Sequence, residues 1–344
     1  MQVKIVSVFD TAEWNNVIKQ CIYYDFYHCN SYNKLDKSGE PFLFIAEDDN
    51  DRVVLPLIKR SIGDSGYFDC TSVWGYPGPV TSRLPEDLSP GLIRFFQQQL
   101  QQYLYEQKVV SAFSRLHTII PQEMLFIDFG NIIHLNKTVA IDLSLPPDMQ
   151  RQQYRKTNKS EINQLRRKGY FVKKANTTEE INAFVDIYTE TMERVNADDY
   201  YFNCFDNEYF HNLLSADDCK PNLLLAYKQN EIAAGGVFMA TKNFMQYHVA
   251  GTKKAFYKET PMKLIVDEAR LLANRLQLNY LHLGGGVGGS DSDSLFWFKS
   301  GFSDLNFTFK IWRLIVNEKI YKDLVNTRSK EKVLNENYFP LYRG

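Results

Sequence analysis

The chain has 344 residues, of which 44% are hydrophobic and 24% are charged, and its formal net charge is −1. This length favours about two domains of ordinary globular composition, and the near-neutral charge argues against overall attraction to a polyanion. Five scattered cysteines without a C-x-x-C pair argue against a disulfide framework and against a zinc site. No apolar run approaches the length of about 18 residues that a membrane span needs, so we expect a soluble, cytoplasmic protein.

The first half of the chain predicts a unit of mixed helices and strands. Residues 2–8 alternate as a strand does, and Asp10 or Thr11 can cap the helix that follows. Residues 42–60 predict a β-hairpin with an acidic turn. Residues 90–107 predict a Gln-rich amphipathic helix, whose apolar stripe is typical of core packing.

Two features of this half are candidate walls of a substrate pocket. The loop GYPGP combines the freedom of Gly75 and Gly78 with the fixed angles of proline around Tyr76, which suits a stiff wall, although an ordinary turn is at least as common. In the strand VVSAFSRLHTII, alternation places Arg115 and His117 on one face. This pair is either a structural polar site or the floor of a pocket for an anionic substrate.

A basic block follows a further strand at residues 138–146, which we expect to close the first unit. Residues 151–174 contain nine Lys and Arg residues and a single acidic residue, Glu161. A solvated helix face is the usual explanation for such a block, and a phosphate-contacting surface is the alternative.

From residue 170 onward the order of elements repeats. A strand and a helix lead to a second hairpin at residues 222–241, a central strand at 245–252 and a helix from Pro261 to Leu276, and a last strand lies at 307–316. Two successive units with one order of elements indicate an internal duplication. We therefore predict an α/β (α+β) protein with a site between its two halves.

The domain boundaries that we predict follow from this repeat. The N-terminal domain covers residues 1–146, and the C-terminal domain covers residues 147–326. A tail at residues 327–344 is polar and then aromatic. It caps either a domain or a neighbouring subunit.

The most distinctive stretch is LNYLHLGGGVGGSDSDSLFWFKSGF, at residues 278–302. It predicts a strand, a glycine loop and a helix, and Gly284, Gly285, Gly286, Gly288 and Gly289 allow close approach of the backbone to a ligand. The stretch matches neither a P-loop nor a dinucleotide fingerprint. A ligand-binding loop and a plain flexible turn are equal alternatives.

The chemistry that remains is that of a transferase without a metal. The six histidines are isolated, no H-E-x-x-H or G-x-S-x-G motif occurs, and we predict no metal ligands. Such a transferase positions two substrates and stabilises the charge that develops between them.

Several motifs occur in one order: SVWGYPGP, FSRLH, TVAIDLS, KTNKSEINQLRRKG, IYTETMERVNADDYYF, and LHLGGG followed by SLFWFKSGFS. With them the chain, from about residue 40 to about residue 325, resembles the FemAB-like group of GNAT-type acyltransferases. The resemblance implies two tandem GNAT domains with mixed central sheets, with the N-terminal domain on the acceptor side and the C-terminal domain on the acyl-donor side. It also implies transfer of an acyl group from acetyl-CoA or another acyl-CoA to an amine of a sugar, nucleotide-sugar or peptidoglycan precursor in cell-envelope biosynthesis.

Two alternatives to this function stay open. The first is a FemX-like aminoacyltransferase that uses aminoacyl-tRNA as donor, and the second is a non-catalytic module that binds an envelope precursor. The basic block favours the tRNA alternative.

The resemblance further implies roles for single residues. Lys299 of the FK-x-GF motif would stabilise the oxyanion, and a lysine that complements a helix C-terminus is the alternative. His248 and His282, on adjacent strands, would accept the proton of the acceptor amine, unless they are structural. The acceptor wall would be formed by Gly75, Tyr76, Gly78, Arg115, His117, Gly285 and Gly286.

An acyl-CoA donor would bind along the central strand and at the next helix. The strand would splay to hold the pantetheine, and the helix start would hold the pyrophosphate. The residues implied are Val249, Gly251, Thr252, Lys258 and Thr260. The glycine-rich pyrophosphate loop of GNAT proteins is missing from KKAFYKETPMK, which argues against CoA, although lysines there can supply charge.

Overall fold

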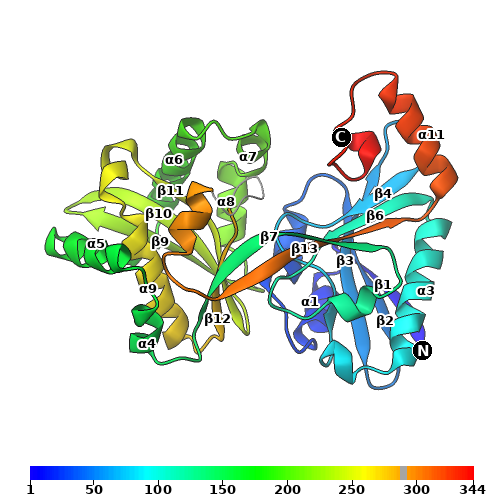
Figure 1. Cartoon of the computed structure of the whole chain (residues 1–344), viewed down its shortest axis with the longest axis horizontal. Helices are drawn as coiled ribbons and strands as arrows, with labels where there is room; N and C mark the ends of the chain where they lie inside the picture. The colour runs from blue at the N-terminus through cyan, green and yellow to red at the C-terminus, as the bar shows by residue number, and fades with distance from the viewer. Residues whose placement is uncertain (287–292) are drawn as a thin grey trace. The chain divides into compact units, whose positions relative to one another are not determined.

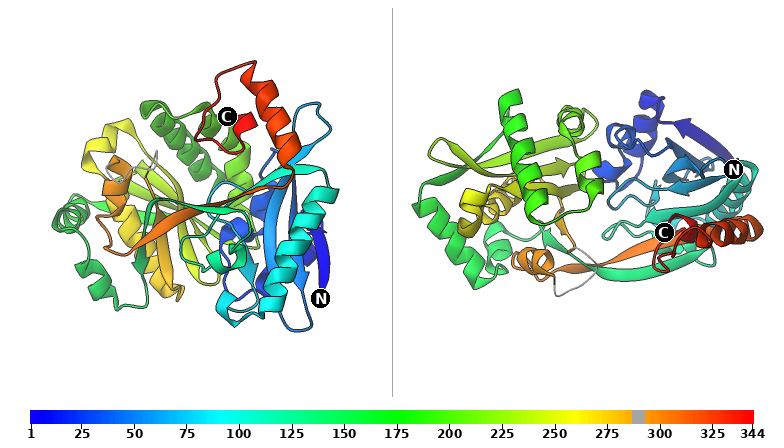
Figure 2. Two further views of the ribbon diagram at one scale, coloured as in Figure 1. Left: turned by 45° about the vertical axis from the view of Figure 1, so that its right-hand side comes forward. Right: turned by 90° about the horizontal axis from the view of Figure 1, so that it is seen from above.

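The chain forms two compact units in the structure, a computed structural model that describes residues 1–286 and 293–344 (Figure 1). Unit 1 comprises residues 1–135 and 308–344, and unit 2 comprises residues 136–307. The polypeptide passes between them within β7 and again within β13, which lie side by side although they are far apart in the sequence (Figure 2). No helix of the described residues is both long and apolar enough to cross a membrane.

Unit 1 contains one sheet in the order β1-β2-β3-β4-β6-β13, with β5 beside β3. Its strands are β1 (Gln2–Ser7), β2 (Glu40–Glu47), β3 (Arg52–Ser61), β4 (Phe68–Thr71), β5 (Val80–Thr81), β6 (Val109–Arg115) and β13 (Asn306–Ile315). Its α-helices are α1 (Thr11–Lys19), α2 (Asn30–Lys34), α3 (Pro90–Glu106) and α11 (Glu318–Ser329). Short 3₁₀ helices lie at Phe26–His28, Pro85–Asp87, Glu123–Phe126 and Leu341–Arg343.

Helix α3 supplies one side of the hydrophobic core of unit 1. Ser89 caps it by accepting a hydrogen bond from the Leu92 amide at 3.1 Å, and Pro90 at the first turn has no amide proton to leave unpaired. The predicted apolar stripe from Leu92 to Leu104 is buried against β2 and β6. The expectation of core packing for this helix is confirmed.

Unit 2 repeats this plan with the strand order β8-β9-β10-β11-β12-β7. Its strands are β7 (Asn131–Asp142), β8 (Tyr170–Lys174), β9 (Lys220–Lys228), β10 (Glu231–Ala240), β11 (Phe244–Thr252) and β12 (Tyr280–Gly284). Its helices are α4 (Pro147–Gln152), α5 (Lys156–Arg167), α6 (Thr178–Arg194), α7 (Asp199–Cys204), α8 (Asn207–Leu214), α9 (Met262–Arg275) and α10 (Ser294–Lys299), with a 3₁₀ helix at Lys254–Glu259. Helices α6 and α9 lie on either side of β9–β11 (Figure 1).

The two sheets share one pairing pattern, which is the structural form of the duplication. In each, four antiparallel strands are followed by a parallel neighbour, β6 beside β4 or β12 beside β11, and by one more antiparallel strand. The predicted α/β fold with mixed central sheets is confirmed.

The last strand of each unit comes from the other repeat of the sequence. Residues 139–142 of β7 pair with β12 in unit 2, and residues 311–315 of β13 pair with β6 in unit 1. The strand at 138–146 therefore does not close the first unit as expected, because the two strands exchange places. The predicted boundaries at residues 146 and 326 differ from the compact units for this reason, and as domain boundaries they stay a prediction.

Candidate functional site

The site begins where β11 and β12 part. The parallel ladder between them pairs only residues 244–246 with residues 280–282, and in the described part of the chain no strand pairs with β11 on that side beyond Gln246. β11 continues beside β10 as far as Thr252, with His248 as the extra residue of a bulge. β12 instead continues beside β7. The expected parting of the central strand from its neighbour is confirmed and forms a fork, while its use by a pantetheine stays a prediction.

Lys299, the last residue of α10, brings its amine to this fork. The Nζ atom donates a hydrogen bond to the Gly285 carbonyl at the end of β12, at 2.7 Å, and lies 5.3 Å from the centroid of the Tyr247 ring on β11. The Lys299 side chain is 7% exposed, and this burial lowers its pKa to about 7, against the opposing effect of Asp293. A buried amine poised between its charged and neutral forms is thus held at the point where the two strands part.

The glycine stretch builds this arrangement locally. Asp293 caps α10, its carboxylate accepting from the amides of Leu295 at 3.0 Å and Phe296 at 3.2 Å. A side chain on Gly286 would collide with that carboxylate, so only glycine permits the cap to approach. Gly285 supplies the acceptor for Lys299, while the candidates Gly288 and Gly289 lie outside the described residues.

The two candidate histidines are buried on the other face of these strands. Alternation along β11 points Tyr247 toward Lys299 and His248 toward α8, where its Nε2 lies 2.6 Å from the Tyr209 hydroxyl. Burial lowers the pKa of His248 to about 3. His282 is fully buried, with Nδ1 2.7 Å from the Gln246 side-chain amide. Acid–base roles for both histidines stay predictions.

Three residues at or beside the fork were not predicted as site residues from the sequence. Gln246 and Tyr247 directly precede His248 in one strand, and the alternation alone already placed Tyr247 on the opposite face from His248. Tyr209 comes from α8, and no local pattern ties it to β11. Only the first two carried a signal that sequence reasoning can use.

Two of the residues predicted for the pantetheine, Gly251 and Thr252, lie against helix α6, and their contact with a donor stays a prediction. The hydroxyl of Thr191 on α6 accepts a hydrogen bond from the Thr252 amide at 3.0 Å and donates one to the Thr252 carbonyl at 3.3 Å. A side chain on Gly251 would lie 2.8 Å from the Ile187 carbonyl, so α6 packs directly on this end of β11. Val249 is buried. The end of β11 is therefore engaged by α6, which leaves the part near His248 as the open edge of the fork.

A carboxylate occupies the position predicted for the pyrophosphate. Glu161 on α5 accepts a hydrogen bond from the Thr260 hydroxyl at 3.3 Å and forms an ion pair with Lys263, in the first turn of α9. Lys258 is exposed on the preceding 3₁₀ helix. A helix start favours negative charge, and here the protein's own side chain supplies it.

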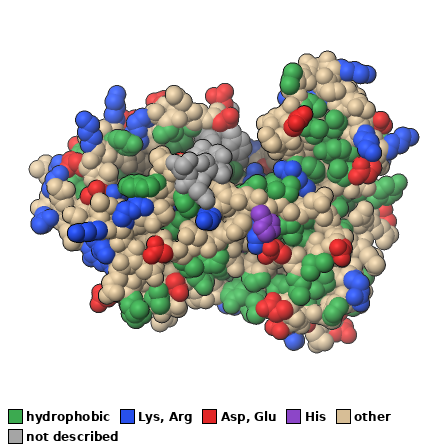
Figure 3. Space-filling model, in the orientation of Figure 1, with side chains coloured by type: hydrophobic (Ala, Val, Ile, Leu, Met, Phe, Trp, Pro, Cys, Tyr) green, Lys and Arg blue, Asp and Glu red, His purple; other side chains and the backbone are tan. Residues whose placement is uncertain are grey.

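Three of the nine Lys and Arg residues in the basic block form ion pairs with described acidic residues of unit 2. Arg166 binds Asp267 at 2.8 Å and Glu268 at 2.7 Å, and other pairs join Lys168 to Glu259 and Lys173 to Glu180. Figure 3 shows acidic side chains among the Lys and Arg side chains on this part of the surface. For these three residues the pairing favours a solvated helix face, and contact of the other six with phosphates stays a prediction.

In unit 1, His117 belongs to a buried polar network. Its Nδ1 accepts from the amides of Ile119 at 3.2 Å and Ile120 at 3.0 Å, so its proton sits on Nε2 and is donated to Asp25 at 3.1 Å. The main-chain amide of His117 donates to Gln122 at 2.7 Å. This geometry favours the structural alternative for His117, and a contact with an acceptor stays a prediction.

The same network fixes the GYPGP loop. Gln122 donates to the carbonyls of Pro77 at 3.0 Å and Pro79 at 2.7 Å, and a side chain on Gly78, where φ is 65°, would collide with Gln122. The ring of Tyr76 packs edge-on against Phe309, with centroids 5.1 Å apart. The loop is thus stiff, as expected.

The remaining candidates of this wall lie beside aromatic rings. Gly75 has φ 120°, and a side chain there would collide with the Tyr27 ring. The half-buried Arg115 holds its guanidinium 5.2 Å from the centroid of the Phe113 ring. Contacts of Gly75, Tyr76, Gly78 and Arg115 with a substrate stay predictions.

Acidification should destabilise the protein because His28, in this network, is buried in its neutral form. Burial, reinforced by neighbouring His117, lowers the pKa of His28 to about 4. The unfolded chain binds the proton at higher pH, so stability present above pH 6.5 is lost as the pH falls toward 4. Between pH 7 and 4.5 we expect the wild type to lose about 2 kcal/mol more unfolding free energy than His28→Gln, measured with urea. Equal losses in both proteins would contradict this account.

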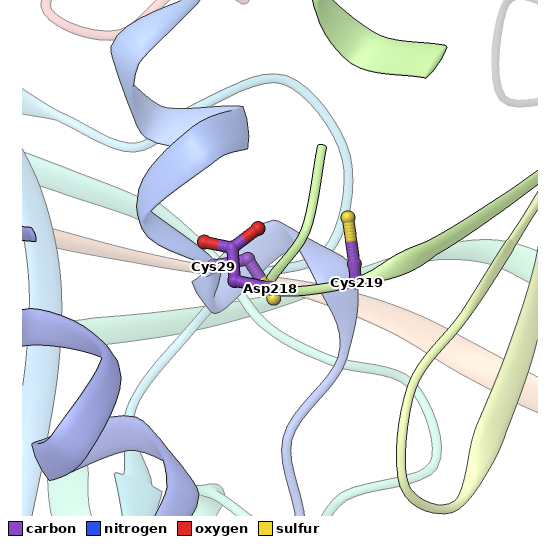
Figure 4. A group of neighbouring side chains, drawn as sticks. All are labelled: Cys29, Asp218 and Cys219. Atoms are coloured by element: carbon purple, nitrogen blue, oxygen red, sulfur yellow. The ribbon is translucent and has the colours of Figure 1, made fainter. Parts of the chain in front are cut away.

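Figure 4 draws Cys29 together with Asp218 and Cys219. Cys29 is the N-cap residue of α2 in unit 1, whereas Asp218 and Cys219 precede β9 in unit 2. Because these residues belong to different units, we assign no metal site to them. The expectation that the protein has no metal stays a prediction.

Comparison with known proteins concerns the fold. No protein-family model matches the chain, and no curated protein matches it. Among solved structures, the crystal structure of FemX is similar with a TM-score of 0.73 at 13% identity, over 94% of this chain and 99% of that chain. The structure of L-PGS from Bacillus licheniformis has a TM-score of 0.58 at 14% identity, over 90% and 93%.

A third structure extends this comparison. The C-terminal domain of a putative lysylphosphatidylglycerol synthetase from Agrobacterium fabrum has a TM-score of 0.57 at 12% identity, over 88% of this chain and 92% of that chain. Identities this low establish the fold alone. The chain has the FemX fold, and the FemAB-like, tandem GNAT-type fold that its motifs predicted is confirmed.

Proposed function

We propose that this protein is an acyltransferase that moves an acyl group onto an amine, with the Lys299 ammonium beside the reacting carbonyl. The observation that carries the proposal is the buried Lys299 amine at the fork between β11 and β12. When the amine of the acceptor molecule attacks the ester or thioester carbon of the donor, the new C–N bond places negative charge on the carbonyl oxygen. The C–O or C–S bond then breaks, and the leaving group takes up a proton. A fixed cation beside that oxygen, in a site with little water, stabilises the charged intermediate.

The acceptor must lose a proton before or during its attack. His248 and His282 lie on the opposite face of the strands from Lys299, so an acceptor entering from that face would meet a proton acceptor while the donor carbonyl faces Lys299. The charged form of Lys299 is lost as the pH rises through about 7, so the rate should fall there while acceptor deprotonation raises it. A bell-shaped pH profile follows from these opposed requirements.

For the donor, we propose an aminoacyl ester such as aminoacyl-tRNA in place of acyl-CoA. The Glu161 carboxylate at the start of α9 would repel a diphosphate at that position, and α6 covers the end of β11 along which a pantetheine would run. The fold neighbour named as a putative lysylphosphatidylglycerol synthetase bears a name that describes an aminoacyl ester product. Acyl-CoA, the first expectation from sequence, stays the alternative, favoured by the parted strands.

The acceptor that the sequence resemblance implies is an amine of a sugar or peptidoglycan precursor. The stiff GYPGP loop with the ring of Tyr76, and Arg115 at the end of β6 in the same unit, are suited to hold such a polar, anionic molecule. A non-catalytic module that binds the same precursor would keep these contacts and would need no buried amine. The dependence of turnover on Lys299 separates the two functions.

Donor binding tests this proposal directly. In calorimetric titrations we expect acetyl-CoA and free CoA to bind more weakly than about 1 mM, and Glu161→Gln to improve CoA binding. A stable aminoacyl-tRNA analogue should shift the protein in a native gel, with affinity that falls steeply as salt rises. Micromolar binding of CoA to the wild type would overturn the aminoacyl donor and leave the acyltransferase proposal standing.

A further inference from the structure

The end of α10 that carries Lys299 is fastened to the start of α5. The Arg155 amide and the Asn158 side-chain amide both donate to the Gly301 carbonyl at 2.9 Å. The Arg155 guanidinium donates to the Trp297 carbonyl at 3.2 Å and to the Ser300 hydroxyl at 3.3 Å, and lies 3.9 Å from the centroid of the Trp297 ring. Residues on both sides of Lys299 are therefore bonded to α5.

Burying the Asn158 side chain costs free energy that no contact within helix α5 offsets. Its side chain is 1% exposed, and its Oδ1 atom has no hydrogen-bond partner among the described residues. A buried oxygen without a hydrogen-bond partner is unfavourable. The hydrogen bond from Asn158 to Gly301 leads away from α5, and a side chain on Gly301 would block it. The contribution of Asn158 is therefore to α10.

We propose that Asn158 and Arg155 are positioning residues that hold the Lys299 amine in the fork. They fix the last turn of α10, so that the amine stays between the Gly285 carbonyl and the Tyr247 ring, shielded from water. The role in catalysis rests on the proposed function of Lys299, whereas the placement of the amine does not.

The protonation of Lys299 reports on this placement. Among the described residues, the titratable groups that face it are Asp293 at the start of α10, which favours the charged form, and the Tyr247 phenol on β11. The Arg155 guanidinium, at the start of α5, lies beside the end of α10. None of these changes in an Asn158 variant. If α10 loosens, water reaches the amine, the desolvation that lowers its pKa is relieved, and its pKa rises.

Competitive labelling of the whole protein with trace acetic anhydride, followed by peptide mass spectrometry, measures the pKa of Lys299 without any substrate. We expect about 7 in the wild type and a rise toward the ordinary lysine value of about 10.4 in Asn158→Ala. Asn163→Ala is the matched control, because Asn163 is exposed on the same helix and bonds to Arg151 instead. An unchanged Lys299 pKa in folded Asn158→Ala would overturn the proposal.

A second variant and an activity measurement complete the test. Arg155→Met keeps the main-chain bond to Gly301 and should raise the Lys299 pKa by a smaller amount, which keeps the test open if Asn158→Ala fails to fold. With an identified substrate, Asn158→Ala should lower kcat by about tenfold to a hundredfold with KM unchanged, and move the alkaline limb of the pH profile upward. A raised pKa without any wild-type turnover would reject the proposed function and keep the positioning role.

Discussion

Replacing Lys299 with methionine should abolish acyl transfer and at the same time make the protein more stable. The proposed function places this amine beside the reacting carbonyl, so kcat/KM should fall by about a thousandfold or more. In the folded protein its pKa is lowered to about 7, so the unfolded chain binds the proton more tightly up to about pH 10. Folding near pH 7 therefore carries a penalty that methionine removes, and we expect a gain of about 2 kcal/mol in unfolding free energy.

Urea unfolding from pH 6 to pH 9.5 checks the stability half of this prediction. The wild type should gain stability as the pH rises across this range, and Lys299→Met should lack that slope. Lys228→Met is the matched control, because Lys228 also lies over aromatic rings in unit 2 but is paired with Glu259 at 2.9 Å. It should keep its activity and lose a little stability. A less stable Lys299→Met protein at pH 7, or one with full turnover, would contradict the account of the fork.

The sequence predicts those parts of the fold that depend on local patterns or on the repeated order of elements. Alternation in the hairpins and the capped helix at Asp10 predict elements one at a time, and their repeated order predicts two similar sheets. The exchange of β7 and β13 was not accessible. Both are strands that follow the same point of their repeat, and nothing in either strand's own alternation says which of two similar sheets it joins.

The site was accessible only where a local motif carries it. The glycine stretch and the FK-x-GF motif marked Lys299, Gly285 and Gly286, which meet in the structure. Glu161 and Asn158 act through contacts with residues more than ninety positions away, and the basic block around them attracted attention to its positive charge instead. Long-range packing, and not composition, decides what such residues do.

Removing the last four residues should destabilise the protein strongly, because the tail completes a buried ion-pair cluster in unit 1. Asp69 is fully buried and accepts from the Arg60 guanidinium at 2.8 Å and from the Tyr342 hydroxyl at 3.3 Å, and it also forms an ion pair with Arg343. Truncation removes two of these three partners together with the buried ring of Tyr342. We expect a loss of about 3 kcal/mol in unfolding free energy, because a buried carboxylate that loses its partners is costly.

A double-mutant cycle separates the charge from the packing. Arg343→Met should lower the unfolding free energy in the wild type and change it much less in an Asp69→Asn background, where no carboxylate is left to pair. The tail was expected to cap either a domain or a neighbouring subunit. Full stability of the truncated chain would mean that the contacts of Tyr342 and Arg343 with Asp69 contribute nothing and would return the tail to the second alternative. A large coupling between Asp69 and Arg343 would instead show that the tail stabilises unit 1, to which the carboxylate and its partner guanidinium both belong.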